Sequence, residues 1–277
     1  MDKSFKRIWE RSLEERRNAQ VGNVRDLLIG SYAPCEPQVM QGVFNFLQAE
    51  KKYPLKNVHN IMDRLAGMMV TTNVVTHDEV LEFIKSIPDG FAIACGPCAC
   101  RLHTASIGPD ARDLASGKLN LCRQSPLNVD IQIAKCGEKF GALPTYKMIS
   151  KDELLALEEE CFNHGLVANI YLIMGGEAGI CHCSSATCVP FMANEALGGA
   201  SSVINKGALI PVTDKTMCLG NGNCAKVCHF KARKQISLNG RTVSTVDYSR
   251  CYGCGLCAAV CPEKAIKMEP RKSIKNG

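Results

Sequence analysis

The chain has 277 residues, long enough for one large domain or two modest ones, and its 46% hydrophobic and 22% charged residues are ordinary for a soluble globular protein. No apolar run approaches the roughly 18 residues of a membrane span, and the charged segment MDKSFKRIWERSLEERR lacks the apolar core of a secretory signal. The sequence therefore argues against a membrane-spanning or secreted protein, and we expect a cytoplasmic one; the formal net charge of +6 leaves the kind of partner open.

Residues 1–90 are predicted to form a helical N-terminal region. Apolar residues recur at helical spacing in segments 36–52 and 57–69, and Pro37 suits the first turn of the former. A third helix is predicted over 76–87, with Thr76 as its N-cap and Pro88 as its stop signal. This region has the character of a scaffold.

Residues 91–210 are predicted to form an α/β cysteine-rich domain. A short apolar strand within 91–101 runs into a cysteine-rich turn, and a capping box of Ser150 and Glu153 opens a helix that ends at Gly165. A strand over 166–174 then leads into a second cysteine-rich turn. This order predicts loops that gather cysteines at one end, with a domain boundary near residue 210 and a third region over 211–277.

Seventeen cysteines indicate metal ligation rather than disulfide bonds. The count is odd, the chain carries no export signal, and most of the thiols lie two to five residues apart. Such spacing lets neighbouring thiolates converge on one centre, but it rarely suits the geometry of a disulfide.

Two cysteine runs lie near the C-terminus: CLGNGNCAKVC from Cys218 and CYGCGLCAAVCP from Cys251. They resemble the bacterial-type two-cluster ferredoxin domain, in which each run supplies three ligands to one cluster and its last cysteine to the other. The resemblance implies an α+β fold, that is, a helical and α/β N-terminal part followed by a dicluster ferredoxin-like domain. It also implies two [4Fe–4S] clusters, one bound by Cys228, Cys251, Cys254 and Cys257 and the other by Cys218, Cys224 and Cys261.

The first run departs from this pattern at two positions. Asn221 stands where the second cysteine is expected, and His229 stands where the family usually has proline. In the family, the second cysteine binds the iron that can be lost. We therefore expect a four-iron cluster that loses iron on oxidation; a native [3Fe–4S] cluster and a ligand from outside the run are the alternatives. His229 is interpreted as a turn variation.

A second group of cysteines lies upstream, in ACGPCACR (Cys95, Cys98, Cys100), at Cys122 and Cys136, and in ICHCSSATC (Cys181, Cys183, Cys188). It resembles anaerobe iron–sulfur proteins with C-x-C-R and I-C-N-C-C type turns ahead of a ferredoxin domain, although Ser184 replaces one expected thiol. We predict one further [4Fe–4S] cluster, with ligands drawn from Cys98, Cys100, Cys122, Cys181, Cys183 and Cys188. Reduced core cysteines, a redox-active disulfide and a zinc site remain alternatives.

Other residues of these turns are assigned smaller roles. Cys95 and Cys136 are held in reserve as ligands, and Cys161, on the apolar side of its helix, is interpreted as a core residue. His182 is interpreted as a turn residue, with a hydrogen bond to sulfur or a proton relay as its alternative roles. Arg101 is expected to form a salt bridge or to donate to sulfur.

Anionic clusters change how the positive charge is interpreted. A [4Fe–4S] core with four thiolates carries about −2, so three clusters would cancel the net charge, and no nucleic-acid partner is predicted. The basic residues of the C-terminal part are expected to form a solvated face: Lys226, Lys231, Arg233, Lys234, Arg250, Lys264 and Lys267. No recognisable nucleotide- or flavin-binding motif is present, so electrons must arrive from another protein.

These observations predict a protein of an anaerobic host that relays single electrons through two or three clusters to or from redox partner proteins, as a component or donor of a reductase system. Two alternatives stay open. One alternative is a reductase with a small-molecule substrate at the upstream site. The other is a redox or oxygen sensor that uses a labile cluster.

Overall fold

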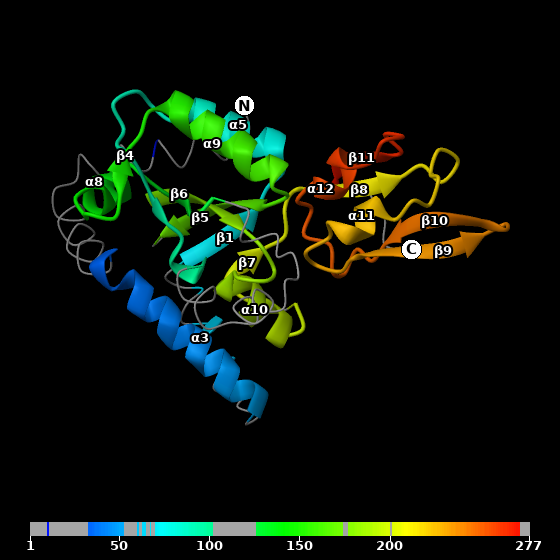
Figure 1. The fold of residues 1–277 in the computed structure, drawn as a ribbon, viewed down its shortest axis with the longest axis horizontal. Helices are drawn as coiled ribbons and strands as arrows, with labels where there is room; N and C mark the ends of the chain where they lie inside the picture. The colour runs from blue at the N-terminus through cyan, green and yellow to red at the C-terminus, as the bar shows by residue number, and fades with distance from the viewer. Residues whose placement is uncertain are drawn as a thin grey trace.

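The computed structural model describes residues 10, 33–52, 60, 63–64, 67, 70–101, 126–173, 177–199 and 201–271. These residues form two parts, an upstream part built on one large sheet and a smaller C-terminal part of short strands and helices (Figure 1). Both helices and strands are present, so the predicted α+β class is confirmed.

The upstream part is built on a seven-stranded sheet in which every neighbouring pair is antiparallel except β1 and β7. In spatial order the strands are β4 (Lys147–Met148), β2 (Ile93–Pro97), β3 (Asn128–Ile133), β6 (Glu177–Cys183), β5 (Val167–Ile173), β1 (Val70–Val74) and β7 (Ile204–Asn205). The strand β1 was not anticipated, because residues 1–90 were predicted to be helical. It pairs with β5 over five residues, so this segment belongs to the sheet.

Helices cover both faces of this sheet: α3 (Glu36–Lys52), which follows the 3-10 turn η1 (Ala33–Cys35), α5 (His77–Ser86), α8 (Lys135–Gly141), α9 (Lys151–Asn163) and α10 (Val189–Ala196). On one face α5 and α9 lie side by side, and Phe83 and Leu154 pack against Ile131 and Ile180 of the strands (Figure 1). On the other face α8 and α10 contact the sheet, and α3 packs against α10 through Phe44.

The predicted helix signals are confirmed where the structure describes them. Thr76 caps α5 and Ser150 caps α9, each in a reciprocal capping box with a glutamate three residues later. The predicted helix over 36–52 corresponds to α3. The predicted helix over 57–69 lies mostly outside the described residues.

The C-terminal part consists of two antiparallel strand pairs and two short helices. The strand β8 (Leu209–Thr213) pairs with β11 (Ile266–Pro270), and β9 (Arg233–Leu238) pairs with β10 (Arg241–Val246). The helices are α11 (Asn223–Lys226) and α12 (Leu256–Ala259). Within the described ranges, no helix combines the length and apolar character needed to cross a membrane.

Candidate metal centres

Five thiols meet at one edge of the seven-stranded sheet. Both β2 and β6 run antiparallel to β3, which lies between them, so their carboxyl ends point to the same edge. Cys98 and Cys100 follow β2, Cys181 and Cys183 end β6, and Cys188 is the N-cap residue of α10. Sulfur hydrogen bonds join them in the order Cys98, Cys100, Cys188, Cys183, Cys181. We call these five residues the upstream thiol group.

The sulfur hydrogen bonds favour thiolates at two positions of this group. Bonds from Cys188 and Cys98 lower the pKa of Cys100 well below its usual value, and bonds from Cys181 and Cys188 do the same for Cys183. The pKa of Cys98 and that of Cys181 are raised, first by the bonds to Cys100 and Cys183, and burial raises that of Cys188. Because the thiolate is the metal-binding form, the group is chemically suited to metal ligation.

Five further upstream cysteines lie elsewhere or are not described, and one of them, Cys35, is exposed. Cys95, a reserve ligand, packs in the core under α5 and donates from Sγ to Asn128 O at 3.4 Å. Cys136, the other reserve, lies in a separate apolar cluster with Phe140, so neither joins the upstream thiol group. Cys161 is buried in the core as predicted. Cys122 lies outside the described residues.

Arg101 and His182 border the upstream thiol group, and both are buried. The Arg101 guanidinium donates to the backbone carbonyls of Pro126 and His182, the latter at 2.8 Å, and among the described residues it donates to no carboxylate or sulfur. His182 lies within β6 rather than in a turn, and its Nε2 bonds to the carboxylate of Glu158. The interpretation of His182 as a turn residue is therefore wrong, whereas its alternative role, a hydrogen bond to sulfur, agrees with its hydrogen bond to Cys161.

Glu158 links His182 to the surface of the upstream part. Its side chain is 1% exposed, and its second oxygen lies 3.2 Å from Nδ1 of His77, whose Nε2 lies 3.1 Å from Glu159. Burial alone would raise the pKa of Glu158, but His182 and His77 outweigh burial and lower it. Through its bond to Glu158, the pKa of His77 is raised. These groups hold three elements, α5, α9 and β6, together through charge-assisted bonds.

A second buried carboxylate contacts the group at Cys181. Asp130 Oδ1 accepts from Tyr171 Oη at 3.1 Å and lies 3.6 Å from Cys181 Sγ, while Oδ2 accepts from Gln132 at 2.8 Å and from Tyr146. Burial raises the pKa of Asp130. These donors satisfy a carboxyl group that would otherwise be costly to bury.

In the C-terminal part, Cys228, Cys251, Cys254 and Cys257 surround one hollow, which we call the Cys254 hollow. It contains about 340 Å³ of space not filled by protein atoms, part of it open to solvent. Burial raises the pKa of Cys251, Cys254 and Cys257, and at Cys257 this effect outweighs the opposing charge and hydrogen bond of Arg233. The backbone N–H of Ala232 donates to Cys228 Sγ at 3.2 Å.

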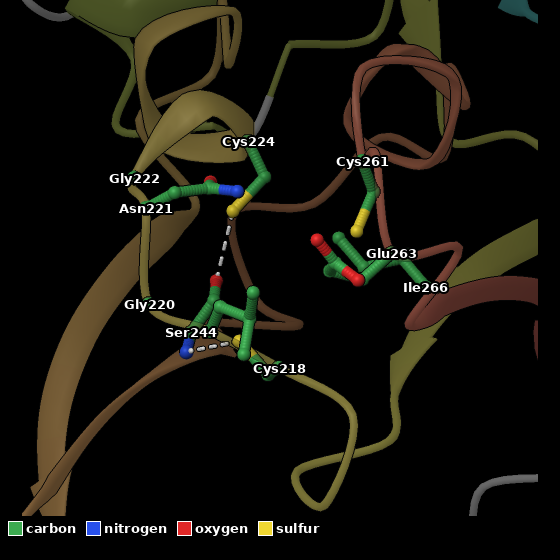
Figure 2. A pocket seen from close by; sticks show the side chains of 10 residues that line it. Cys218, Gly220, Asn221, Gly222, Cys224, Ser244, Cys261, Glu263 and Ile266 are labelled. Atoms are coloured by element: carbon green, nitrogen blue, oxygen red, sulfur yellow. Dashed lines mark hydrogen bonds between the residues drawn. The ribbon is translucent and has the colours of Figure 1, made fainter.

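Cys218, Cys224 and Cys261 surround a second hollow of about 330 Å³ together with Asn221, which we call the Asn221 hollow (Figure 2). Ser244 N donates to Cys218 Sγ at 3.3 Å, and Ser244 Oγ lies 3.1 Å from Cys224 Sγ.

Glycines shape the loops of both hollows. Gly220 and Gly253 have φ of 66° and 82°, and a Cβ there would lie 2.3 Å from Thr242 O and 2.1 Å from Leu209 O, respectively. Only glycine allows the chain to turn this closely past a neighbouring strand. The loops therefore depend on these glycines to direct the thiols inward.

Residues 211–268 match the family model of the 4Fe-4S dicluster domain. The match spans both hollows and all seven thiols that line them, so the C-terminal part is a ferredoxin-like dicluster domain, and it supports iron–sulfur electron transfer in general. The match does not extend to the upstream thiol group. No curated protein matches the chain.

The thiols of the dicluster domain fit clusters better than single metal ions. Among the described residues, no three Cys, His, Asp or Glu side chains are arranged to hold one metal ion, and this includes the thiols of the dicluster domain. A cluster distributes its thiolates over separate irons and needs no such close convergence. Arg233 also indicates that an anionic cluster fits the Cys254 hollow. No carboxylate lines this hollow beside the guanidinium, and the buried Nε of Arg233 has no hydrogen-bond partner among the described residues.

The dicluster domain packs against the upstream part at the Cys254 hollow. Phe230 stacks on Tyr252 with ring centroids 4.4 Å apart, and it also contacts Phe191 of α10 at 5.1 Å. Tyr252 Oη accepts from Asn194 Nδ2 at 2.7 Å. One apolar cluster contains Tyr252 and Leu256 together with Cys183 and Cys188, and Cys254 packs against it.

His229 joins the two parts directly. Its Nδ1 accepts from Ser185 N at 3.1 Å, and its Nε2 lies 2.8 Å from Gly165 O, to which it donates. Because Nδ1 accepts a hydrogen bond, the ring is neutral, and burial lowers the pKa of His229 accordingly. His229, at the position where proline was expected, thus makes two hydrogen bonds between the two parts. The interpretation of His229 as a turn variation did not anticipate them.

Arg233 was also misjudged. It was expected in the solvated face, and the other six basic residues of that set are exposed, but Arg233 is 5% exposed and lines the Cys254 hollow. No local sequence pattern marks it: only the fold places Arg233 at the start of β9, directly after buried Ala232 and at the hollow.

Proposed function

We propose that the chain is an iron–sulfur electron-transfer protein that relays single electrons through the two clusters of the dicluster domain and a third cluster held by the upstream thiol group. When bound, each cluster supplies a one-electron carrier. In this proposal Cys228, Cys251, Cys254 and Cys257 hold one cluster, and Cys218, Cys224 and Cys261 hold another. The third takes four ligands from the upstream thiol group, and Cys122 is a further candidate.

The observation that carries this proposal is the apolar wall shared by the two cysteine sites. Cys183 and Cys188 on one side and Cys254 on the other belong to the same packed cluster, and His229 fixes the two parts across it. Such packing excludes water and brings the two sets of sulfur atoms to one interface. This arrangement suits a relay, and it supports a role as a component or donor of a reductase system that exchanges electrons with redox partner proteins.

Metal and sulfide analysis of protein purified without air tests the proposal. We expect about 12 irons and a similar amount of sulfide per chain, or about 11 irons if the cluster at Asn221 has lost one. About 8 irons would contradict the upstream cluster and leave the dicluster domain intact. Stoichiometric zinc, or a colourless protein, would contradict the proposal as a whole.

For the Asn221 hollow we propose a four-iron cluster that loses one iron on oxidation. Asn221 is exposed, and its Oδ1 accepts from Asn223 N at 3.1 Å, so this oxygen is already engaged within the turn. Among the residues that line the hollow, Glu263 alone carries a carboxylate, and Figure 2 shows its side chain directed toward the space between the thiols. Glu263 is therefore the ligand from outside the run that the structure offers.

Replacing Asn221 by Cys is expected to remove the nearly isotropic EPR signal of a three-iron cluster that brief air exposure produces in the unaltered protein. A fourth thiolate would bind the iron at this corner and slow its loss. Asn221→Ala serves as the control and should retain the signal. If Asn221→Cys gives the same three-iron EPR signal at the same rate of iron loss as the unaltered protein, the iron that is lost does not lie next to position 221. Glu263→Gln should speed iron loss only if its carboxylate is a ligand.

A further inference from the structure

Arg233 places a buried positive charge at one of the two hollows. It is the first residue of β9, its side chain lines the Cys254 hollow, and only 5% of the residue is exposed. Its Nη2 donates to Cys257 Sγ at 3.3 Å, and its Nη1 donates to Thr213 Oγ1 at 2.7 Å. The guanidinium is thus held between a strand of the domain and one of the thiols.

The other hollow has no such charge. The two cysteine runs repeat the same spacing, so that Cys228 corresponds to Cys261, and Arg233 corresponds to Ile266. Ile266 starts β11 as Arg233 starts β9, and it lines the Asn221 hollow. The domain therefore carries an arginine in one hollow and an isoleucine at the equivalent position of the other.

The charge of Arg233 has no carboxylate to balance it within its hollow. The residues lining the Cys254 hollow include four cysteines and no Asp or Glu. Arg233 Nε, moreover, is buried without a hydrogen-bond partner in the described part of the chain. Burying an unpaired cation is unfavourable unless an anion compensates its charge. A negative group bound in this hollow would supply the compensation, and a thiolate-bound cluster of about −2 fits this need.

We propose that Arg233 sets the reduction potential of the cluster bound by Cys228, Cys251, Cys254 and Cys257, raising it above the value that the same four thiolates would give beside an apolar side chain. The inference rests on the proposed function, because a potential can be measured only if these thiols bind a cluster. Reduction adds one negative charge, and a fixed cation that donates to a ligating sulfur stabilises the reduced form more than the oxidised form. Arginine suits this role since it keeps its charge when buried.

This role of Arg233 predicts which of the two clusters in the dicluster domain has the higher reduction potential. The Cys254 hollow is the one that packs against the upstream part, whereas Leu219 and Met217, next to the Asn221 hollow, are exposed. Among the four-iron forms, the higher potential then belongs to the site nearer the upstream thiol group. The lower potential belongs to the site at the exposed side.

The test is an anaerobic titration of the full chain with dithionite, followed by EPR, in Arg233→Met, Arg233→Gln and Arg233→Lys variants. Lys234→Ile is the matched control, because it removes one positive charge from the next residue of the same strand, which is exposed. Both neutral Arg233 variants should lower one cluster potential enough to change its ratio of reduced to oxidised form at least tenfold, about 59 mV for one electron. Arg233→Lys and Lys234→Ile should stay within a small part of that shift.

The outcomes separate the inference from the proposed function. Iron analysis accompanies each variant; absence of clusters in the unaltered protein would overturn the proposed function. Full iron content with unchanged potentials in both neutral variants would overturn the role of Arg233, and so would an equal shift in Lys234→Ile. Loss of iron in both neutral variants but not in Arg233→Lys would show a cation needed for assembly and would likewise overturn the proposal. Ile266→Lys should raise the reduction potential of the cluster in the Asn221 hollow. This shift identifies which measured potential belongs to which of the two clusters.

Discussion

Alanine at both Cys183 and Cys188 is expected to lower the iron content of protein purified without air from about 12 to about 8 atoms per chain. These two residues occupy the middle of the upstream thiol group, where hydrogen bonds connect Cys183 to Cys181 and Cys188 to Cys100. Without them, Cys181 is separated from Cys98 and Cys100, and the three remaining thiols no longer form one connected group. The two clusters of the dicluster domain should persist, with their EPR signals in the reduced protein.

The matched control for this double variant is Cys95→Ala. Cys95 is equally buried and lies on β2, three residues before Cys98, but it packs in the core on the other face of the sheet. It should retain about 12 irons. Equal loss of iron in Cys95→Ala, or no loss in the double variant, would show that the upstream thiol group is not the ligand set.

The sequence could predict which thiols of the dicluster domain act together, because the spacing of a cysteine run determines which sulfur atoms reach one cluster. It could also predict that the upstream turns meet, since cysteines at the ends of β2 and β6 gather at one edge once both strands flank β3. Which cysteines of a turn take part was harder to decide. Cys95 and Cys98 are close in sequence, but Cys95 lies within β2 and packs in the core with Ile131, whereas Cys98 follows the strand.

Arg233, His229 and Glu158 escaped prediction for a common physical reason. Each acts through partners distant in the chain: Arg233 donates to Cys257 of α12, and His229 bonds to Ser185 and Gly165 of the other part. A charged or polar residue is usually solvated, and no local pattern marks the exceptions. Only the packing of the two parts and of α9 on the sheet turns these positions into buried contacts.

Glutamine at Glu158 is expected to lower the free energy of local unfolding of the upstream part by about 3 kcal/mol, because it leaves buried His182 beside an uncharged side chain. Glu158 and His182 are both almost fully buried, at 1% and 2% exposure, and the carboxylate also contacts His77. Backbone amides of β6 and α9 should therefore exchange hydrogen about 100-fold faster in native-state experiments. Glu160→Gln, two residues along the same helix and exposed, is the control and should change exchange little.

The pH dependence of this effect gives an independent check. The pKa of Glu158 is lowered in the folded chain, so its contribution is complete above its usual value of 4.5 and is lost as the pH falls through the folded value. The pKa of His77 is raised, so its contribution is complete below 6.5 and is lost as the pH rises through the folded value. The difference between the unaltered protein and Glu158→Gln should therefore be largest between about pH 4.5 and about pH 6.5. A difference that does not change with pH would mean that Glu158 stabilises the upstream part by packing rather than by charge, because only the ionised carboxylate distinguishes the two side chains.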